Sequence, residues 1–475
     1  MNLTRPNPHR IDTMPTVHLP ALTRRKLLLA GAAAPLLAAC TAGVPASEAP
    51  PIVFVHGNGD TAGLWLTTLW RFESNGWPRA RLHAIDMPYP QARDDDTKPQ
   101  EGRSSSAENM QFLGAEVDKV LRTTGARQVV LMANSRGGYA VRNYIANGGG
   151  AAKVSHAILG GTPNHGVFAN PIARTGSEFN GAGPFLSALN APKGAAGDEV
   201  TPGVRWLTIR SDNNDKFAQP DGVWIGAKGT PTNVTAEGPA LKGAQNVVIA
   251  GIDHRETAFS GAAFEQAFRF ITGKAPAFTI VPEATVTLDG KVSGFGVNNE
   301  LGTSPSNLPL AGARVEVFEC DPASGARSGA AVHRKAIGAD GLWGPFTANG
   351  RAAYEFVIAA PGYATTHIYR SPFPRSSSIV NLRAERLLDA DKDAGAVLTL
   401  TRPRGYFGVS RDRIALDGTS PPAGIPPGTA GVSTAKLKLA DAAGRAVAGE
   451  FNGERIVGRS WPVADNHLTL IELHY

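Results

Sequence analysis

The chain has 475 residues, of which 42% are hydrophobic and 19% are charged. This length predicts two or three globular domains, and the composition excludes collagen, a coiled coil and a chain that is disordered throughout. Five basic residues and one acidic residue before residue 40 carry most of the net charge of +6, so the rest of the chain has no electrostatic footprint for nucleic acid. Two cysteines, Cys40 and Cys320, are too few for a disulfide framework.

Residues 1–40 have the pattern of an export signal. Residues 23–28 (Thr-Arg-Arg-Lys-Leu-Leu) resemble the twin-arginine motif, and the apolar run 27–39 after the arginines is too short to cross a bilayer of about 30 Å. The run ends in Leu-Ala-Ala-Cys, which resembles a bacterial lipoprotein box. This implies export across the inner membrane, a periplasmic or cell-surface location, and lipid attached to Cys40 as a membrane anchor. A plain signal with an incidental cysteine is the alternative. Cys320 is then expected to be a small buried hydrophobe.

Residues 48–275 alternate between strand and helix patterns. Ser105 and Glu108 form a capping-box pattern ahead of one helix, a second helix is expected after residue 138, and a third at residues 262–271. Alternation of this kind predicts a mostly parallel sheet covered by helices on both faces. The strands are expected at residues 51–55, 80–85, 128–132, 154–159, 204–209 and 246–250.

The second half changes character after residue 276. Strand patterns with a period of two alternate with Gly, Pro and Asn turns, which predicts one or two all-β sandwich or barrel modules. A boundary near residues 386–395 would divide this half into modules 276–386 and 387–475. The first module loosely resembles transthyretin-like domains. The strands are expected at residues 285–292, 313–319, 353–359, 397–401, 436–439 and 468–473.

Residues 133–137 (Ala-Asn-Ser-Arg-Gly) place Ser135 between a predicted strand and a predicted helix. A serine on so sharp a turn needs small residues two positions away on either side, and Ala133 and Gly137 provide them. The helix that follows would direct backbone N–H groups and the positive end of its dipole toward the serine. We therefore predict that Ser135 is a nucleophile. The alternative is an ordinary serine in a glycine-rich turn.

A serine nucleophile needs a base, for which His254 is the candidate. It follows the last predicted strand, where the chain order serine, acid, histidine puts the base; the alternative is a structural histidine. The acid is expected after strand 204–209, where both Asp212 and Asp215 occur. We favour Asp215, because residues 215–220 resemble an Asp-x-x-x-x-Pro run found at the acid loop of serine hydrolases. Asp212 stays open, and either aspartate could instead cap a turn.

Two backbone N–H groups are expected to stabilise the negative charge that develops on the substrate oxygen. One belongs to Arg136, the residue after the nucleophile. The other belongs to the loop at residues 56–59 (His-Gly-Asn-Gly), where Asn58 is the candidate. Glycines in this loop would let the backbone approach the oxygen closely.

Together these pieces resemble a lipase or esterase of the α/β-hydrolase superfamily over residues 50–275. Residues 159–166 are similar to a stretch after the nucleophile helix of bacterial triacylglycerol lipases, and residues 183–190 resemble a cap segment lining the acyl pocket. With its β-rich second half, the chain also resembles two-domain archaeal lipases with a C-terminal β-domain. Some of those place the acid where this chain has Gly161. The resemblance implies a secreted serine carboxylic-ester hydrolase that cleaves ester or lipid-like small molecules through an acyl-enzyme.

Two other functions remain open: a cell-surface binding lipoprotein on an inactive hydrolase scaffold, and acyl transfer by the same three residues. The sequence has no P-loop, dinucleotide fingerprint or Cys/His metal spacing, so we expect neither a cofactor nor a metal. The acidic run at residues 389–393 lacks the glycine and glutamate positions of a calcium loop and is expected to be a solvated turn. The acyl chain length, the oligomeric state, and whether residues 86–106 or 167–200 act as a lid stay open.

Overall fold

The computed structural model describes residues 49–299, 302–442 and 444–475. The predicted export signal and its lipidation site Cys40 lie outside these residues. Among the described residues, no helix has both the length and the apolar character that crossing a membrane requires. Cys320 is a buried free thiol, as expected.

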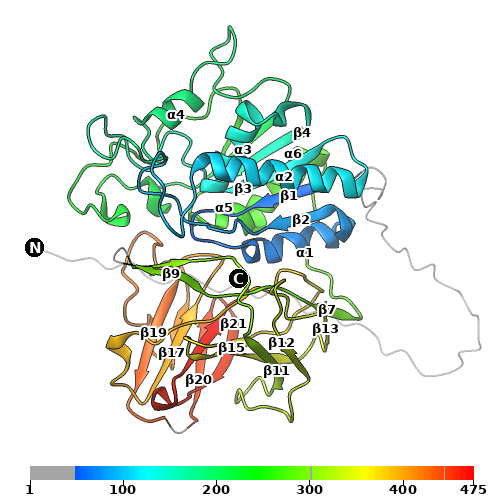
Figure 1. Cartoon of the computed structure of the whole chain (residues 1–475), viewed down its shortest axis with the longest axis vertical. Coiled ribbons are helices and arrows are strands. Elements are labelled where there is room, and N and C mark those ends of the chain that lie inside the picture. The colour runs from blue at the N-terminus through cyan, green and yellow to red at the C-terminus, as the bar shows by residue number, and fades with distance from the viewer. Residues whose placement is uncertain (1–48, 300–301, 443) are drawn as a thin grey trace, which may run out of the picture. The chain divides into compact units, whose positions relative to one another are not determined.

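The first half of the chain contains a six-stranded sheet in which every neighbouring pair is parallel (Figure 1). Its strand order, β2-β1-β3-β4-β5-β6, departs from the chain order only at β1 and β2. The sheet confirms the predicted fold class, and each predicted strand is present with ends shifted by a few residues. The strands are β1 (Ile52–Val55), β2 (Leu82–Ile85), β3 (Val129–Asn134), β4 (Val154–Gly160), β5 (Arg205–Arg210) and β6 (Gln245–Val248).

Helices cover both faces of this sheet because successive side chains of a buried strand point in opposite directions. On β1, Phe54 packs with aromatic residues of α1 and α6, whereas Val53 and Val55 pack with apolar residues of α2 and α3. The capping box predicted at Ser105 opens α2, with its side chain accepting from the backbone N–H of Glu108. The helices are α1 (Leu66–Ser74), α2 (Ser106–Thr124), α3 (Arg136–Asn147), α4 (Pro184–Leu189), α5 (Glu256–Phe259) and α6 (Gly261–Thr272).

The second half is built of β-sheets, as predicted. Its largest sheet has the order β12-β11-β14-β15-β22-β17-β19. Several strands were not expected from the sequence, among them β12, β15, β20 and β21. The strands of this sheet are β11 (Arg314–Cys320), β12 (His333–Ala336), β14 (Ala353–Ala359), β15 (Thr365–Arg370), β17 (Ala396–Thr401), β19 (Thr434–Leu439) and β22 (His467–Glu472). The others are β7 (Val286–Leu288), β8 (Val292–Ser293), β9 (Phe295–Asn299), β10 (Gly302–Pro305), β13 (Phe346–Ala348), β16 (Leu382–Arg383), β18 (Ile414–Leu416), β20 (Ala446–Phe451) and β21 (Glu454–Arg459).

Two details of this half differ from the sequence pattern. The run at residues 285–292 is divided into β7 and β8, which pair with different strands, β13 and β16. The seven-stranded sheet also takes strands from both sides of residue 386, since β15 pairs in parallel with β22. The division into modules 276–386 and 387–475 stays a prediction, although one sheet is shared by both stretches.

Candidate active site

Ser135 lies on the sharp turn between β3 and α3 that the sequence pattern indicates. Its backbone has φ 52° and ψ −124°, a conformation that costs a non-glycine residue about 1–3 kcal/mol. The surrounding structure holds the turn through hydrogen bonds from the Ser135 N–H to the carbonyl of Gly160 (2.9 Å) and from the Gly138 N–H to the carbonyl of Ser135 (2.9 Å). Strain of this kind persists where it serves a site, and here it leaves the serine side chain at the wall of a cavity.

Glycines make this turn sterically possible. A Cβ atom on Gly137 would lie 2.6 Å from the carbonyl oxygen of His56, and one on Gly57 would lie 2.9 Å from the Cβ of Ser135. Neither distance is compatible with a side chain. The loop after β1 and the start of α3 therefore approach each other through their backbones.

His254 and Asp215 meet at the ends of their strands. The Oδ2 of Asp215 lies 2.8 Å from the Nδ1 of His254, and both residues are buried. The other oxygen of Asp215 accepts from the backbone N–H of Phe217 (2.8 Å), whose ring packs edge-on against the imidazole at 4.7 Å. The Nε2 of His254 is buried and has no hydrogen-bond partner among the described residues. The imidazole is thus oriented through Nδ1, with its other nitrogen available.

Asp212, the alternative acid, makes different contacts. Its carboxylate accepts from the backbone N–H groups of Asn214 (3.0 Å) and Gly251 (3.0 Å), which ties the acid loop to the loop that carries His254. Burial raises its pKa, but these hydrogen bonds outweigh burial and leave the pKa below the ordinary value. Asp212 therefore caps turns, and of the two candidates only Asp215 contacts the histidine.

The end of β4, the strand after the nucleophile helix, is followed by Gly161 and has no room for an acidic side chain. Gly161 has φ 57°, and a Cβ there would lie 2.7 Å from the carbonyl oxygen of His254 and 3.3 Å from its Nδ1. The histidine loop occupies the space that a longer side chain would need. Asp215, one strand further along the sheet, supplies the carboxylate instead.

Ser135 and His254 line one cavity of about 190 Å³. Its walls are largely aromatic and aliphatic, and they come from residues 163–179, residues 217–225 and Tyr406. None of residues 86–106 or 183–190 lines it. The expectation that residues 183–190 line an acyl pocket is therefore wrong, because Leu186 and Leu189 of α4 pack against Tyr139 instead. Within the two segments, the wall residues are Pro163, Val167, Phe168, Arg174, Phe179, Phe217, Trp224 and Ile225, and the cavity is also lined by Gly57, Asn58, Asp60, Asn134 and Arg255.

The two predicted oxyanion donors belong to the loop after β1, which carries Asn58, and to the start of α3, which carries Arg136. Asn58 lines the cavity, and its side chain accepts from the backbone N–H of Ala92 (2.7 Å), which fixes the loop after β1. Arg136 is the first residue of α3, where backbone N–H groups have no partner within the helix. The structure thus brings the Asn58 loop and the start of α3 to the cavity that holds the serine.

The side chain of Arg136 has a role that sequence reasoning did not find. It is buried and forms a bidentate ion pair with the equally buried Glu178, and it donates to the carbonyl of Ser104 (2.6 Å). Asn134, on the other side of Ser135, donates to the carbonyls of Gly160 (3.1 Å) and His254 (3.3 Å). The residues flanking the serine therefore anchor it to three separate loops. The separation of 42 residues between Arg136 and Glu178 leaves no local sequence signal.

The β-rich half holds the histidine loop. Arg402 donates to Asp253 (2.6 Å) and to Glu256 (2.6 Å), and the backbone N–H of Tyr406 donates to Asp253 as well (2.8 Å). Asp253 precedes His254 and is fully buried, so its charge depends on these partners. Residues more than 140 positions away in the chain thus determine where His254 lies.

The acid loop has a similar contact with this half. Lys216, next to Asp215, donates to the carbonyl of Gly431 (2.9 Å) and lies over the ring of Tyr406 at 4.0 Å. Burial, and then the charge of Arg255, lower the pKa of Lys216 to about 8. Burial likewise raises the pKa of Tyr406 to about 12, so its hydroxyl stays protonated at the wall of the cavity.

Comparison with known proteins agrees with this geometry. Residues 52–284 match the model of the alpha/beta hydrolase family, and residues 284–387 match the lipase C-terminal domain. Among solved structures, the chain is similar to the propeptide form of Bacillus licheniformis lipase BlEst2, at 15% identity and a TM-score of 0.33 over 88% of this chain and 93% of that one. The mature form of that lipase matches at 20% identity and 0.32 over 48% and 93%, and Aspergillus fumigatus lipase B at 14% and 0.33 over 48% and 54%.

These TM-scores are below 0.5, so the domain assignment rests on the family models and on the sheet itself. The all-parallel order β2-β1-β3-β4-β5-β6, with Ser135 on the turn after β3, agrees with the first model. The first half of the chain therefore has the parallel sheet of an alpha/beta hydrolase, and residues 284–387, which match the lipase C-terminal domain, lie in the half that is built of β-sheets.

Proposed function

We propose that the protein is a serine carboxylic-ester hydrolase in which Ser135 is the nucleophile, His254 the base and Asp215 the orienting acid. One observation carries the proposal: the 2.8 Å contact from Asp215 to Nδ1 of His254, with the unpartnered Nε2 of that ring and the strained Ser135 at the same cavity. In an apo site the bond from serine to histidine is often long and shortens only when substrate binds.

The reaction then follows from these positions. The Ser135 oxygen attacks the ester carbonyl carbon while Nε2 of His254 takes the serine proton. The imidazolium returns that proton to the alcohol oxygen as the ester C–O bond breaks, which leaves the acyl group on Ser135. Water, deprotonated by the same nitrogen, attacks the acyl-enzyme and releases the carboxylic acid. Asp215 stays ionised throughout and stabilises the imidazolium.

The negative charge that develops on the carbonyl oxygen would be stabilised by the backbone N–H groups of Asn58 and Arg136. Removing one such donor costs other hydrolases about 10²–10³ in kcat. Both donors belong to the backbone, so no substitution at these positions deletes them. Their support is instead open to mutation, through the side-chain contacts of Asn58 with Ala92 and of Arg136 with Glu178.

The catalytic cavity favours short acyl groups. Its 190 Å³ is below the roughly 300–1,000 Å³ typical of sites for drug-sized ligands, and its walls are mainly apolar. Phe168 and Phe179, from the segment 167–179, narrow it on one side. We infer that esters of short acids react faster than esters of palmitate, and that this segment has to move before a long chain can enter.

Hydrolysis of p-nitrophenyl esters from acetate to palmitate tests the proposal. Turnover should be greatest for the short esters and absent in Ser135→Ala, a substitution that removes one oxygen atom from a partly open cavity and should leave thermal unfolding unchanged. Activity that survives in Ser135→Ala would remove the serine from the mechanism. No turnover with any ester would favour a binding protein on a hydrolase scaffold.

We also propose that the protein is exported and held at a bacterial membrane by lipid on Cys40, as the leader pattern indicates. Membrane fractionation of cells that express the full chain tests this. Cys40→Ser should move the protein from the membrane fraction to the soluble fraction, whereas Cys320→Ser, a change at the other cysteine, should not. A wild-type protein that is already soluble would contradict the proposal.

A further inference from the structure

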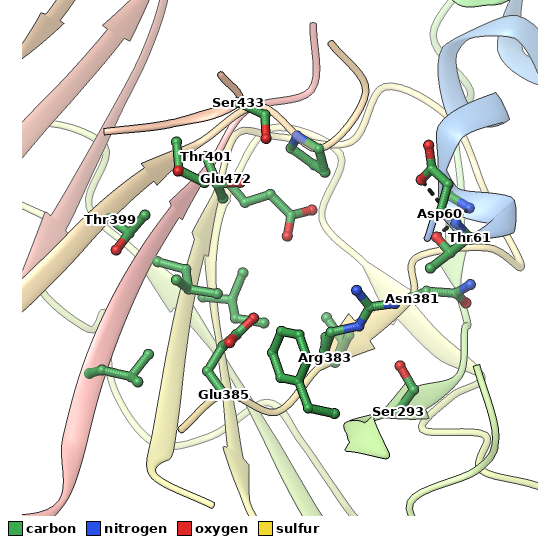
Figure 2. Close-up of a pocket in the computed structure, with 18 of the residues that line it drawn as sticks. Asp60, Thr61, Ser293, Asn381, Arg383, Glu385, Thr399, Thr401, Ser433 and Glu472 are labelled. Atoms are coloured by element: carbon green, nitrogen blue, oxygen red, sulfur yellow. Dashed lines mark hydrogen bonds between the residues drawn. The ribbon is translucent and has the colours of Figure 1, made fainter. Parts of the chain in front are cut away.

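A second and larger cavity, of about 610 Å³, lies where the seven-stranded sheet meets the loop after β1 (Figure 2). Its floor is one face of β15, β22, β17 and β19. Alternate residues of each strand face it. On β17, Thr399 and Thr401 face the cavity, whereas Leu398 and Leu400, which alternate with them, belong to the core of the β-half. The opposite wall comes from residues 379–391 and from the loop at residues 59–64.

The cavity is rich in hydroxyl groups that the protein itself does not use. Six serine or threonine residues line it. Thr61 accepts from the backbone N–H of Gly63 (3.1 Å), and the side chains of the other five have no hydrogen-bond partner among the described residues. Thr399, Thr401 and Ser433 are half-buried and Thr434 is exposed, so these hydroxyls are available to a ligand or to water that enters the cavity. The five residues are Ser293, Thr399, Thr401, Ser433 and Thr434.

Charged side chains add acceptors and donors to the same space. Figure 2 shows Glu385, Glu472 and Arg383 around the middle of the cavity. The carboxylate of Glu385 forms no hydrogen bond or ion pair within the described part of the chain, and burial raises its pKa to about 7. Glu472 pairs with Arg370 (3.1 Å) through one oxygen only. Within the described residues, Arg383 makes one side-chain hydrogen bond, from Nη2 to Asn307 (3.2 Å).

A ligand that satisfies this lining must both donate and accept hydrogen bonds at many points. A purely anionic ligand would satisfy the arginines of the lining but not the carboxylates, and an aliphatic chain would offer the hydroxyls no hydrogen-bond partner. A sugar offers several hydroxyl groups, each of them donor and acceptor, and an apolar C–H face for the aliphatic floor residues Ile368 and Leu470. The volume lies within the range of small-molecule sites.

We propose that this cavity is a carbohydrate-binding site, with Glu385, Arg383, Thr399 and Thr401 as its principal polar contacts. It is separate from the catalytic cavity but adjoins it. The ion pair of Asp60 with Arg255 (3.1 Å) lines both cavities. A sugar bound here would therefore lie beside the hydrolase site, whether or not the catalytic proposal holds.

Binding to the full chain carrying Ser135→Ala tests the proposal without any turnover. The probes are maltose, lactose, chitobiose and glucuronic acid, and their binding is measured by saturation-transfer NMR and titration calorimetry. Decanoate serves as an apolar competitor. The double variant Thr399→Val/Thr401→Val removes two hydroxyls and keeps shape and β-branching. Its matched control is Thr287→Val/Thr347→Val, a cross-strand pair of exposed threonines on β7 and β13 that do not line the cavity.

At least one sugar should bind, about tenfold more weakly to Thr399→Val/Thr401→Val and to Glu385→Gln, and unchanged to the control pair. Glucuronic acid binding alone would identify a sugar acid matched to Arg383, whereas the neutral disaccharides would identify a neutral carbohydrate. Three results would overturn the proposal. None of the four sugars binds, or the cavity variants bind the sugar as tightly as the wild type does, or decanoate binds in the cavity without displacing the sugar.

Discussion

Replacing Asp215 with asparagine should abolish most activity by changing the tautomer of His254. In the protein, one oxygen of Asp215 accepts from the N–H of Phe217 (2.8 Å) and the other lies 2.8 Å from Nδ1 of His254. An asparagine can keep only one oxygen, and the fixed N–H of Phe217 requires it. The amide NH₂ group then faces Nδ1, which must accept, so the ring proton moves to Nε2 and that nitrogen can no longer take a proton from Ser135.

The expected loss is about 10⁴-fold in kcat, the size of the same change in the trypsin triad, or about 5.5 kcal/mol at 1.4 kcal/mol per factor of ten. Asp212→Asn is the matched control, since the Asp212 carboxylate accepts from Asn214, Gly251 and Ser211 and, among the described residues, does not contact His254. That variant should lose less than about tenfold, through the loosened loop alone. The assay is kcat on p-nitrophenyl butyrate, with thermal unfolding to confirm the fold. Equal losses, or a greater loss in Asp212→Asn, would refute the reasoning.

Three further substitutions test other parts of the structure. Arg402→Met leaves Asp253 buried and without its main charged partner, so the free energy of unfolding should fall by about 3–5 kcal/mol in urea titrations. An unchanged midpoint would contradict a stabilising contact between Arg402 and Asp253. Glu385 has a pKa of about 7 in the folded protein, above the ordinary 4.5, so its stabilising contribution is complete below pH 4.5 and is lost as the pH rises through 7. Glu385→Gln stays neutral and should therefore match the wild type near pH 4.5 but exceed its stability at pH 8, by up to about 3 kcal/mol; no pH dependence of the difference would argue against a buried carboxyl. Gly57→Ala introduces a Cβ 2.9 Å from that of Ser135, so the turn must shift; kcat/KM should fall about 100-fold and the temperature of unfolding should fall as well. Full activity would mean that the loop after β1 and the serine turn are not held in contact.

Local patterns in the sequence were enough to predict the elements around Ser135 and His254. The run of apolar residues before Ser135 and the small residues Ala133 and Gly137 around it have one physical reading, a strand that turns sharply into a helix. The order of strands along the chain then predicts where a histidine and an acid can meet, because parallel strands bring their carboxyl ends to one edge of the sheet. Asp215 could be preferred on its local run, but only its contact with Nδ1 separates it from Asp212.

The same patterns could not predict what supports the site. The cap segment at residues 183–190 has apolar residues at a helical spacing, which is equally consistent with lining a pocket or with packing on Tyr139; the fold selects packing. In the second half, β12 is too polar and β21 too rich in charged residues to be predicted as strands. They form strands because β12 pairs with β11 and β21 pairs with β20. Strand propensity is weak where cross-strand contacts decide.

By itself, the sequence determined the hydrolase fold, the nucleophile turn and the chain order of the three candidate catalytic residues, because these depend on hydrophobic periodicity and on steric demands within a few residues. Only the tertiary structure decided which aspartate meets His254, that Arg402 and Tyr406 of the β-half hold the loop of that histidine, and that free hydroxyls gather in a second cavity. Those features depend on contacts between residues tens to hundreds of positions apart, and no local pattern encodes which of the many possible long-range pairs forms.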